Sequence, residues 1–364
     1  MSGRPGLRPP DATTSVESGI LESFPDPVVV VGGDRAVVAA NRAAREIIGP
    51  AYHGRNLALA LRHPEVLDTV DRVLRSGESR SVEVSLPGAF VRTFNLQAVL
   101  VPAGETTAGP QVALVFHDVT VARQSEAMRR DFVANVSHEL RSPLSALLGM
   151  IETLQGPACE DVQARERFLG IMNAEARRMT RLIEDLLSLS RVEIHEHVPP
   201  RGRVDLAGVL RGVVDSAGAA SEEARRRIAV SIAGDLPKVV GDADELRQVL
   251  QNLVDNALKY SRPGTAVRID VRGVPRVPQH GGPGVAVSVS DESEGIPAED
   301  VPRLTERFYR VDKGRSRSLG GTGLGLAIVK HIINRHRGHL AVESRLGVGS
   351  TFTVTLPAAA SEGV

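Results

Sequence analysis

The strongest constraint on the fold of this chain is the spacing of apolar residues between positions 121 and 192. In the first half of this stretch they recur every three or four residues, as on one face of a helix. The positions are Met128, Phe132, Val136, Leu140, Leu144, Leu147, Ile151 and Leu154. A second series with similar spacing consists of Phe168, Met172, Met179, Leu182, Leu186 and Leu189. The dipeptide Gly156-Pro157 separates the two series, so we expect an antiparallel helical hairpin.

The expected hairpin carries an apolar seam along both arms, and a single hairpin offers little against which to bury it. A repeat near 3.5 residues is typical of helices that pack side by side in bundles. Pairing with a second copy would bury both seams in a four-helix bundle. The sequence therefore predicts a homodimer held together by residues 121–198.

The hairpin lies between two segments of different character, so the expected fold is an α+β multidomain chain. Residues 1–18 are rich in Pro, Gly, Ser and Thr and lack apolar periodicity, which predicts a disordered leader. Residues 19–120 predict a small α+β domain. After a linker at 199–202, residues 203–357 alternate helices and strands as an α/β sandwich, and a polar tail follows from 358.

Within the first domain, turn residues separate short runs with strand character. A helix is expected at 41–48, after strands that flank the turn Gly32-Gly33-Asp34. Further strands are expected near 82–86, 91–100 and 111–118.

Composition excludes several kinds of function. The 364 residues include 44 Lys and Arg and 44 Asp and Glu, so no overall basic field is available to hold a nucleic acid. Aromatic residues make up 3% and Trp is absent, which argues against a base-stacking surface. The single cysteine, Cys159, fits a reducing cytoplasm. No apolar run near the start approaches the roughly 20 residues of a membrane span, so we expect a soluble, cytoplasmic protein.

His138 lies on the opposite side of its expected helix from the apolar seam. At 100° per residue, Val136 and Leu140 point within about 40° of each other, and His138 lies roughly 180° from their mean. A lone exposed histidine is usually an ordinary surface residue. That interpretation does not explain the adjacent Glu139, nor Pro143 inside a helix, where proline frees a backbone carbonyl.

Residues 132–144, FVANVSHELRSPL, resemble the H-box of sensor histidine kinases. The resemblance implies phosphorylation of His138, whose neutral imidazole can attack the γ-phosphorus of ATP. It assigns the role of base to Glu139, which would accept the proton from the other ring nitrogen. It also implies that Ser142, four residues after the histidine, positions the water that hydrolyses the phosphoaspartate of a regulator.

Residues 248–260, QVLQNLVDNALKY, resemble the N-box of the same family. Asn252, Asn256 and Lys259 are spaced i, i+4 and i+7, so they form one stripe of a helix. An amide oxygen suits Mg²⁺, and an ammonium can meet a phosphate. The resemblance assigns the metal to Asn256 and ATP binding to all three residues together with Tyr260. The other interpretation is an ordinary polar helix face.

Residues 287–291 predict a strand that ends in a turn. The resemblance implies that Asp291 accepts a hydrogen bond from the adenine amino group, and that Gly295 also contributes to ATP binding. Where the family has D-x-G-x-G, this chain places Ser293 at the first glycine. If that position requires a positive φ, Ser293 costs about 1 kcal/mol of strain and weakens nucleotide binding.

Residues 307–310, RFYR, resemble the F-box, and residues 320–326, GGTGLGL, resemble the G2 box that opens a helix. The ATP-binding residues implied in the second motif are Gly321, Thr322, Gly323, Leu324 and Gly325. The basic loop between the motifs, with Arg315 and Arg317, is expected to form a lid over the triphosphate. Such glycines also occur in dinucleotide folds, but these require a strand directly before the glycines, and the loop has no strand pattern.

Residues 24–31 and 116–120 look like parts of a PAS domain. A flavin adduct would require a cysteine there, and none is present. Three histidines are only weak candidates for a haem ligand: His53, His63 and His117. We therefore expect no bound cofactor in this domain. Five others are expected to be surface residues rather than metal ligands: His195, His197, His331, His336 and His339.

In family order, these boxes cover about residues 121–357. The chain resembles a dimeric sensor histidine kinase with PAS, HisKA-type and GHKL (Bergerat) ATPase domains, most like the phosphate-regulon sensor kinases. The resemblance implies ATP and Mg²⁺ as cofactors and a response regulator as partner. Because the chain shows no membrane anchor, it would meet its upstream partner from the cytoplasm.

Two other interpretations stay open. One is a gyrase-type or heat-shock-type ATPase without phosphotransfer, although such proteins have no histidine on a bundle helix. The other is a degenerate kinase that scaffolds a regulator, and Ser293 motivates it.

Overall fold

The computed structural model describes residues 19–50, 53–87, 90–102, 109–156, 160–196, 198–312, 314 and 321–359. The chain forms two compact units, Met1–Val133 and Ala134–Val364. None of the helices in the described part has the length and hydropathy of a membrane span. The expected leader, Cys159 and the lid residues Arg315 and Arg317 lie outside the described residues.

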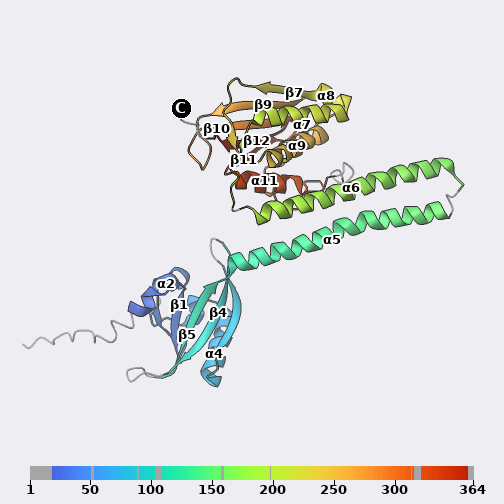
Figure 1. Ribbon diagram of the computed structural model, residues 1–364. Helices are drawn as coiled ribbons and strands as arrows, with labels where there is room; N and C mark the ends of the chain where they lie inside the picture. Colours follow the sequence, from blue (N-terminus) through green and yellow to red (C-terminus); the bar gives the residue numbers. More distant parts are fainter. Residues whose placement is uncertain are drawn as a thin grey trace, which may run out of the picture. The chain divides into compact units, whose positions relative to one another are not determined.

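A five-stranded antiparallel sheet forms the centre of the first unit (Figure 1). Its strands are β1 (Val28–Gly32), β2 (Val37–Ala40), β3 (Arg80–Leu86), β4 (Arg92–Val101) and β5 (Gln111–Asp118). They lie in the order β2-β1-β5-β4-β3. Alternate side chains are buried along them, and the rings of Phe94 and Phe116 meet edge to face with centroids 5.9 Å apart. The strands predicted near 82–86, 91–100 and 111–118 are confirmed.

Three helices connect β2 to β3: α2 (Arg42–Ile48), α3 (Leu57–Ala60) and α4 (Pro64–Ser76). Asn41 begins α2, as predicted, and its Oδ1 accepts hydrogen bonds at 2.9 Å from the backbone N–H groups of Ala44 and Val28. This buried amide therefore caps α2 and fastens it to β1. Helix α4 was not expected from the sequence. Proline occupies its first turn, and it buries Val66, Val70 and Val73 against the sheet.

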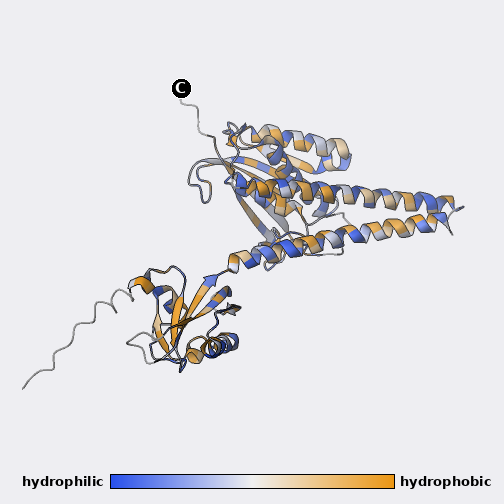
Figure 2. Cartoon of the chain, turned by 60° about the horizontal axis from the view of Figure 1, so that its bottom comes forward, coloured by the Kyte–Doolittle hydropathy of each residue, from blue (hydrophilic) through white to orange (hydrophobic). Residues whose placement is uncertain are grey.

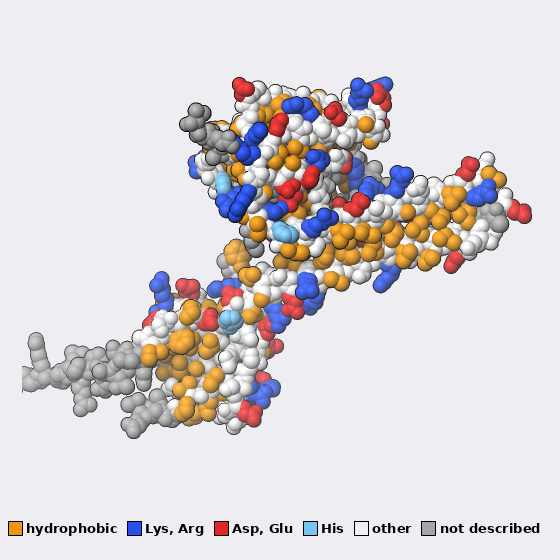
Figure 3. All heavy atoms as spheres, viewed as in Figure 1, with side chains coloured by type: hydrophobic (Ala, Val, Ile, Leu, Met, Phe, Trp, Pro, Cys, Tyr) orange, Lys and Arg blue, Asp and Glu red, His pale blue; other side chains and the backbone are white. Residues whose placement is uncertain are grey.

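Two long helices, α5 (Thr120–Gln155) and α6 (Val162–Ile194), form the predicted hairpin. Helix α5 ends just before Gly156, and the Asp161 carboxylate caps α6 by accepting from the Ala164 N–H at 3.0 Å. Figure 2 shows hydrophobic and hydrophilic residues alternating around both arms. Part of the seam remains uncovered, and Figure 3 shows it as a band of hydrophobic side chains along the hairpin. Its exposed members include Met128, Leu144 and Ile151. Other exposed apolar side chains on the hairpin are Leu148, Leu169, Ile183 and Leu187.

The second unit also contains an α/β lobe whose sheet has the order β11-β12-β10-β9-β7. The strands are β7 (Ile228–Ile232), β9 (Val267–Val274), β10 (Gly284–Asp291), β11 (His339–Arg345) and β12 (Gly349–Pro357). Strands β7 and β9 are parallel and the other pairs are antiparallel. Helices α7 (Leu206–Ala220), α9 (Ala243–Tyr260) and α11 (Gly325–Arg335) form a layer against this sheet (Figure 1). The predicted α/β sandwich is confirmed.

Short elements complete the lobe. They are β6 (Arg203–Val204), β8 (Val239–Val240), α8 (Glu222–Arg227) and the 3₁₀ turn η1 (Val301–Arg303). Strands β6 and β8 pair with each other directly after the predicted linker. Ala358 pairs with Val239, and the Ala359 N–H donates to the Lys238 carbonyl at 2.7 Å. The polar tail was predicted to begin at 358, but these two residues still belong to the fold.

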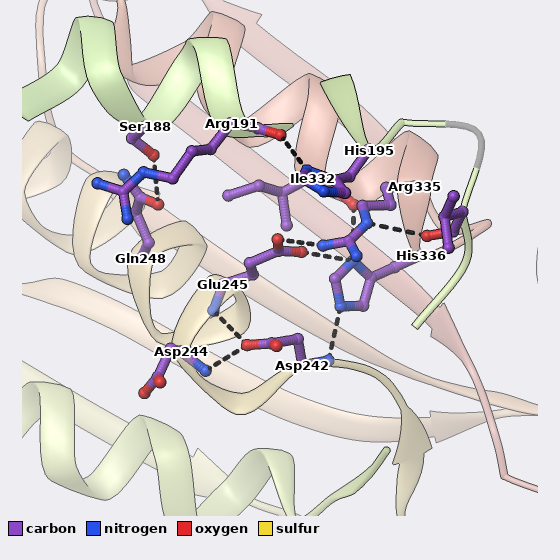
Figure 4. Close-up of polar contacts among 11 residues, drawn as sticks. Ser188, Arg191, His195, Asp242, Asp244, Glu245, Gln248, Ile332, Arg335 and His336 are labelled. Atoms are coloured by element: carbon purple, nitrogen blue, oxygen red, sulfur yellow. Dashed lines mark hydrogen bonds and ion pairs between the residues drawn. The ribbon is translucent and has the colours of Figure 1, made fainter. Parts of the chain in front are cut away.

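His336 is not the surface residue that the sequence suggested. Its side chain is fully buried, at the end of α11 (Figure 4). Nε2 accepts a hydrogen bond at 3.0 Å from the backbone N–H of Asp242, and Nδ1 donates to the Ile332 carbonyl at 2.8 Å. The imidazole thus joins α11 to the first turn of α9, and the bond accepted by Nε2 requires the neutral form with its proton on Nδ1. Beside it, Arg335 pairs with Glu245 on α9.

This arrangement predicts acid sensitivity of the lobe. Burial lowers the pKa of His336, so the folded state binds its proton less readily than the unfolded state does. The stabilising contribution is therefore present above about pH 6.5 and is lost as the pH falls below that value, by at most ~1.4 kcal/mol per pH unit. We expect the urea midpoint of the full chain to fall between pH 7.5 and 5.5.

The H336Q variant provides the comparison. It should be less stable at pH 7.5 but show a shallower loss of stability on acidification, because glutamine does not titrate. Parallel pH profiles for H336Q and the parent would show that another group is responsible.

Candidate active site

A cavity of about 690 Å³ opens between α9, the end of β10 and the start of α11. This volume suits a small-molecule ligand. The residues predicted to bind ATP that line it are Asn252, Asn256, Lys259, Tyr260, Asp291, Gly295, Gly321, Thr322, Gly323 and Gly325. Leu324 was also predicted, but its side chain is buried in the core and does not line the cavity. Tyr309 and Arg310 of the F-box also line the cavity, so four sequence motifs that are far apart along the chain meet at one site.

Helix α9 supplies the polar stripe of the cavity. Asp242 caps its first turn by accepting from the N–H groups of Asp244 and Glu245, and the opposite face is buried in the core. Asn252 and Asn256, on the polar face, are half-buried. Asn252 also lies so close to Gly325 that a Cβ there would come within 2.8 Å of its Oδ1. This contact explains the glycine that opens α11.

Lys259 ends the stripe as a partly desolvated cation. Burial lowers the pKa of its ammonium group, and the nearby guanidinium groups of Arg310 and Arg181 lower it further, while Tyr260 opposes the shift. The Lys259 Nζ lies 4.9 Å from the centre of the Tyr260 ring. An anionic ligand would relieve the repulsion among these cations, so this end of the cavity favours phosphate.

Asp291 stands at the end of β10, almost completely buried. Its Oδ1 accepts hydrogen bonds from the backbone N–H groups of Ser293, at 3.0 Å, and Ser350, at 3.3 Å. Burial raises the pKa of this carboxyl, and hydrogen bonds to Ser293 and Ser350 oppose the rise. The carboxylate is thus fixed in orientation at the cavity wall.

The expectation of strain at Ser293 was wrong. Ser293 is not among the residues with positive φ, so no glycine is required there. Its N–H donates to Asp291, its Oγ accepts from the Gly295 N–H at 3.2 Å, and the residue is buried. Serine therefore stabilises the turn beside the cavity, and the motivation for a degenerate kinase disappears.

We accordingly expect S293G to weaken ATP binding rather than tighten it. The substitution removes the acceptor for the Gly295 N–H and gives the turn more backbone freedom. Titration with a non-hydrolysable ATP analogue should show an affinity about fivefold lower than that of the parent. S293A, which removes only the hydroxyl, should fall between the two. Tighter binding by S293G would restore the strain argument.

Two glycines of the predicted site do adopt a positive φ angle and leave no room for a side chain. Gly295 has φ +73°, and a Cβ there would collide with the Arg345 carbonyl. Gly323 has φ +74°, and a Cβ would come within 2.9 Å of the Phe308 Cα. The Phe308 N–H donates to the Gly323 carbonyl at 2.8 Å. The F-box and the G2 box are therefore directly paired at the cavity.

The hairpin residues predicted for phosphotransfer lie on α5. His138 and Ser142 are exposed, as expected. Glu139 is half-buried, and its Oε2 accepts from Arg178 on α6 at 2.9 Å and from Arg310 at 3.2 Å. The sequence did not indicate these two arginines. Arg310 stands in the quoted F-box but received no role there, and Arg178 carried no signal.

Helix α6 also contacts the ATP-binding lobe directly. The Thr322 hydroxyl donates to Asp185 at 2.7 Å, and Ser188 donates to Gln248 at 2.8 Å. Burial raises the pKa of Asp185, and the bond from Thr322 opposes the rise. The G2 box therefore touches the hairpin as well as the cavity.

His331 was predicted to be a plain surface residue, but its ring nitrogens lie near the carboxylates of Glu193 and Glu196, close to the end of α6. Glu193 pairs with Arg307 at 2.7 Å, and His331 Nδ1 lies 3.2 Å from Glu196. His331 is thus a partly buried contact residue between α11 and the end of the hairpin.

The described residues contain no group of three or more His, Cys, Asp or Glu side chains that could hold a metal ion. Mg²⁺ does not need such a group, since it usually takes one or two protein ligands together with phosphate oxygens and water. The half-buried amide of Asn256, at the cavity wall, is a suitable oxygen donor. The residues present therefore fit a magnesium ion bound together with a nucleotide.

An ATPase-like lobe beside a helical hairpin that presents an exposed histidine defines a protein-histidine kinase. Residues 128–194 match the family described as His Kinase A (phospho-acceptor) domain. Residues 241–360 match the family described as Histidine kinase-, DNA gyrase B-, and HSP90-like ATPase. The chain belongs to the sensor histidine kinases.

Curated relatives extend over most of the chain. It is 36% identical over 332 residues to the phosphate regulon sensor protein PhoR of Pseudomonas aeruginosa, covering 90% of this chain and 71% of PhoR. It is 41% identical over 235 residues to the sensor-like histidine kinase SenX3 of Mycolicibacterium smegmatis, covering 64% of this chain and 58% of SenX3. Among solved structures, histidine kinase ThkA in complex with the response regulator TrrA aligns at 21% identity with a TM-score of 0.47, covering 95% and 99% of the two chains.

Proposed function

We propose that this chain phosphorylates His138 from Mg·ATP and passes the phosphoryl group to an aspartate of a response regulator. The observation that carries the proposal is the hydrogen bond between Glu139, next to the exposed histidine, and Arg310, which lines the nucleotide cavity. This contact links the hairpin residue beside the acceptor to the predicted ATP site. Membership in the sensor histidine kinases supports the same assignment.

The proposed chemistry consists of two displacements at phosphorus. An imidazole nitrogen of His138 attacks the γ-phosphorus, the bond from the γ-phosphorus to the bridging oxygen breaks, and ADP leaves. Glu139 takes the proton from the other ring nitrogen. A carboxylate oxygen of the regulator's aspartate then attacks the same phosphorus and the P–N bond breaks. The leaving imidazole takes up a proton from Glu139 or from water, which restores the neutral ring.

Each nucleotide contact has a proposed residue. Asp291 accepts from the adenine amino group, for which its fixed carboxylate at the cavity wall is suited. Lys259 and Tyr260 hold the phosphates, and Arg315 and Arg317 contribute to ATP binding through their positive charge. Asn256 would hold Mg²⁺, which neutralises charge on the transferring phosphoryl group.

We also propose that the protein works as a homodimer. The apolar side chains left exposed along α5 and α6 support this, because a second hairpin would bury them in a four-helix bundle. Analytical ultracentrifugation should give twice the chain mass.

The first domain is proposed to be a PAS-like sensor domain without a bound cofactor. Its five-stranded antiparallel sheet, with three helices between the second and third strands, supports the assignment. A cytoplasmic location is proposed because the substrate, ATP, is found there.

The test of the main proposal is the stability of the label after incubation with γ-labelled ATP. A P–N bond to imidazole is labile in acid and stable in base, so the label should disappear at low pH and survive in alkali. Release of labelled phosphate without labelled protein would instead indicate an ATPase without phosphotransfer.

We further propose a phosphatase activity that depends on Ser142. Ser142 is exposed one turn beyond His138 and keeps a hydroxyl that can orient water, although it lacks the methyl group that fixes a threonine rotamer. S142A should retain autophosphorylation but dephosphorylate the prelabelled regulator about tenfold more slowly with ADP present. S142T should equal or exceed the parent. Equal decay with the parent and S142A would exclude Ser142 from this reaction.

A further inference from the structure

Glu139 is the centre of a small, largely buried charge cluster. Its Oε2 receives hydrogen bonds from Nη2 of Arg178, at 2.9 Å, and Nη2 of Arg310, at 3.2 Å. The three side chains are 14%, 11% and 6% exposed. One carboxylate oxygen is thus shared by two cations, one from each side of the contact between hairpin and lobe.

The two arginines differ in what else they touch. Arg178 also pairs with Glu175, at 3.5 Å, one turn earlier on α6, and it does not line the nucleotide cavity. Arg310 does line the cavity, and its Nε is buried without a hydrogen-bond partner among the described residues. Its charge also reaches Lys259, whose pKa it helps to lower. Arg310 therefore has an unmet demand for an acceptor, and Arg178 does not.

We infer that Arg310 exchanges Glu139 for a phosphate when ATP binds, and that this exchange frees Glu139 to act as the base. The inference rests on the proposed function for the placement of the phosphates beside Lys259. A triphosphate carries more negative charge than one carboxylate and offers several acceptor oxygens, so it can satisfy both Nη2 and the unpartnered Nε.

The exchange changes what Glu139 can do. While Arg178 and Arg310 both donate to its Oε2, this oxygen is occupied by two donors. Release of Arg310 removes one of these donors, while Arg178 continues to hold the side chain in place. Glu139 would then be ready for the proton of His138 only when a phosphate donor is bound. Arg310 is in this sense a positioning residue for the base.

A double-mutant cycle on nucleotide affinity tests the exchange without requiring phosphotransfer. The apparent affinity for ATP equals the intrinsic affinity multiplied by the fraction of molecules in which Arg310 is available to a phosphate. Molecules in which Glu139 holds Arg310 therefore lower the apparent affinity. E139Q weakens that hold while preserving size and an acceptor oxygen. Titration of the full chain with a non-hydrolysable ATP analogue should therefore give about fivefold tighter binding for E139Q than for the parent. In the R310A background, E139Q should change the affinity by less than about twofold.

Two controls test whether tighter binding by E139Q comes from the release of Arg310 or only from the loss of a negative charge near the cavity. E175Q removes the other carboxylate that pairs with Arg178 without freeing Arg310, and it should leave ATP affinity unchanged. AMP, which lacks the terminal phosphates, should bind E139Q and the parent equally. Thermal unfolding verifies that each variant folds, and R310Q replaces R310A if the latter does not.

Two outcomes would overturn the inference: no tightening by E139Q, or the same tightening with and without Arg310. Failure of the proposed function has a different signature, since it would appear as absence of acid-labile label in the parent whatever the affinities are.

Discussion

The H138A variant will take up no label from γ-labelled ATP, while binding nucleotide as tightly as the parent. The expected loss of labelling is at least about a thousandfold, because the substitution removes the attacking nitrogen and no neighbouring group replaces it. Nucleotide binding is retained because His138 is not among the described residues that line the cavity. The measurement is label incorporation together with titration by a non-hydrolysable ATP analogue.

A matched control is H195A, which removes an exposed histidine from the end of the other arm of the hairpin. This variant should incorporate label like the parent. Label on H138A would mean that a different side chain is the acceptor, and loss of label in H195A would mean that histidine removal acts through the fold.

The second large effect is expected for N256D. A carboxylate at this position places an additional negative charge toward the triphosphate and changes how Mg²⁺ is held, so labelling should fall by roughly 100-fold or more. N256D should nevertheless unfold at the same temperature as the parent, since the side chain lies on the polar face of α9. Labelling of N256D at the parental rate would remove Asn256 from the proposed metal site.

Mixing N256D with H138A distinguishes transfer within a chain from transfer between chains. If transfer crosses the dimer, mixed dimers regain label, because one chain supplies the nucleotide lobe and the other supplies His138. If transfer stays within one chain, mixed dimers remain unlabelled. Subunit exchange is verified by pull-down of one tagged variant with the other.

The fold was predictable where one physical pattern dominates a segment. The 3.5-residue apolar repeat predicted the hairpin, and the break at Gly156 located its turn within a residue of the observed end of α5. Short runs with strand character, separated by turn residues, predicted the strands of the first domain. Helix α4 was missed although the sequence carries a helical signal there, with a proline in the first turn, buried valines at 66, 70 and 73, and Gly77 at its end.

The residues of the candidate site were predictable where a local sequence motif contains them. They were not predictable where the fold brings together residues that are distant in the sequence. The motifs predicted ten of the residues that line the cavity, counting Asn252 through Gly325. The partners of Glu139 lie 39 and 171 residues away in the sequence, so no local pattern indicated them. His336 was misjudged for the same reason, since its burial depends on the packing of α11 against α9.

Ser293 was misjudged through a different kind of reasoning. The loss of a family glycine suggested a positive φ, whereas the turn is held by the serine hydroxyl and the Asp291 carboxylate. A glycine in a motif can reflect the size of a neighbour as well as a backbone angle, and sequence alone does not separate these reasons.

The hydrogen bond from Phe308 to Gly323 has a consequence for how this protein could change over evolution. It holds together two residues whose contact does not depend on how many residues lie between them in the sequence. The entropic cost of joining two points of a chain grows only with the logarithm of the number of residues between them, and doubling that number costs about 0.6 kcal/mol. Insertions and deletions between Phe308 and Gly323 therefore have little effect on the stability of the sheet. Related kinases could differ in length at this place while Phe308 and Gly323 stay paired.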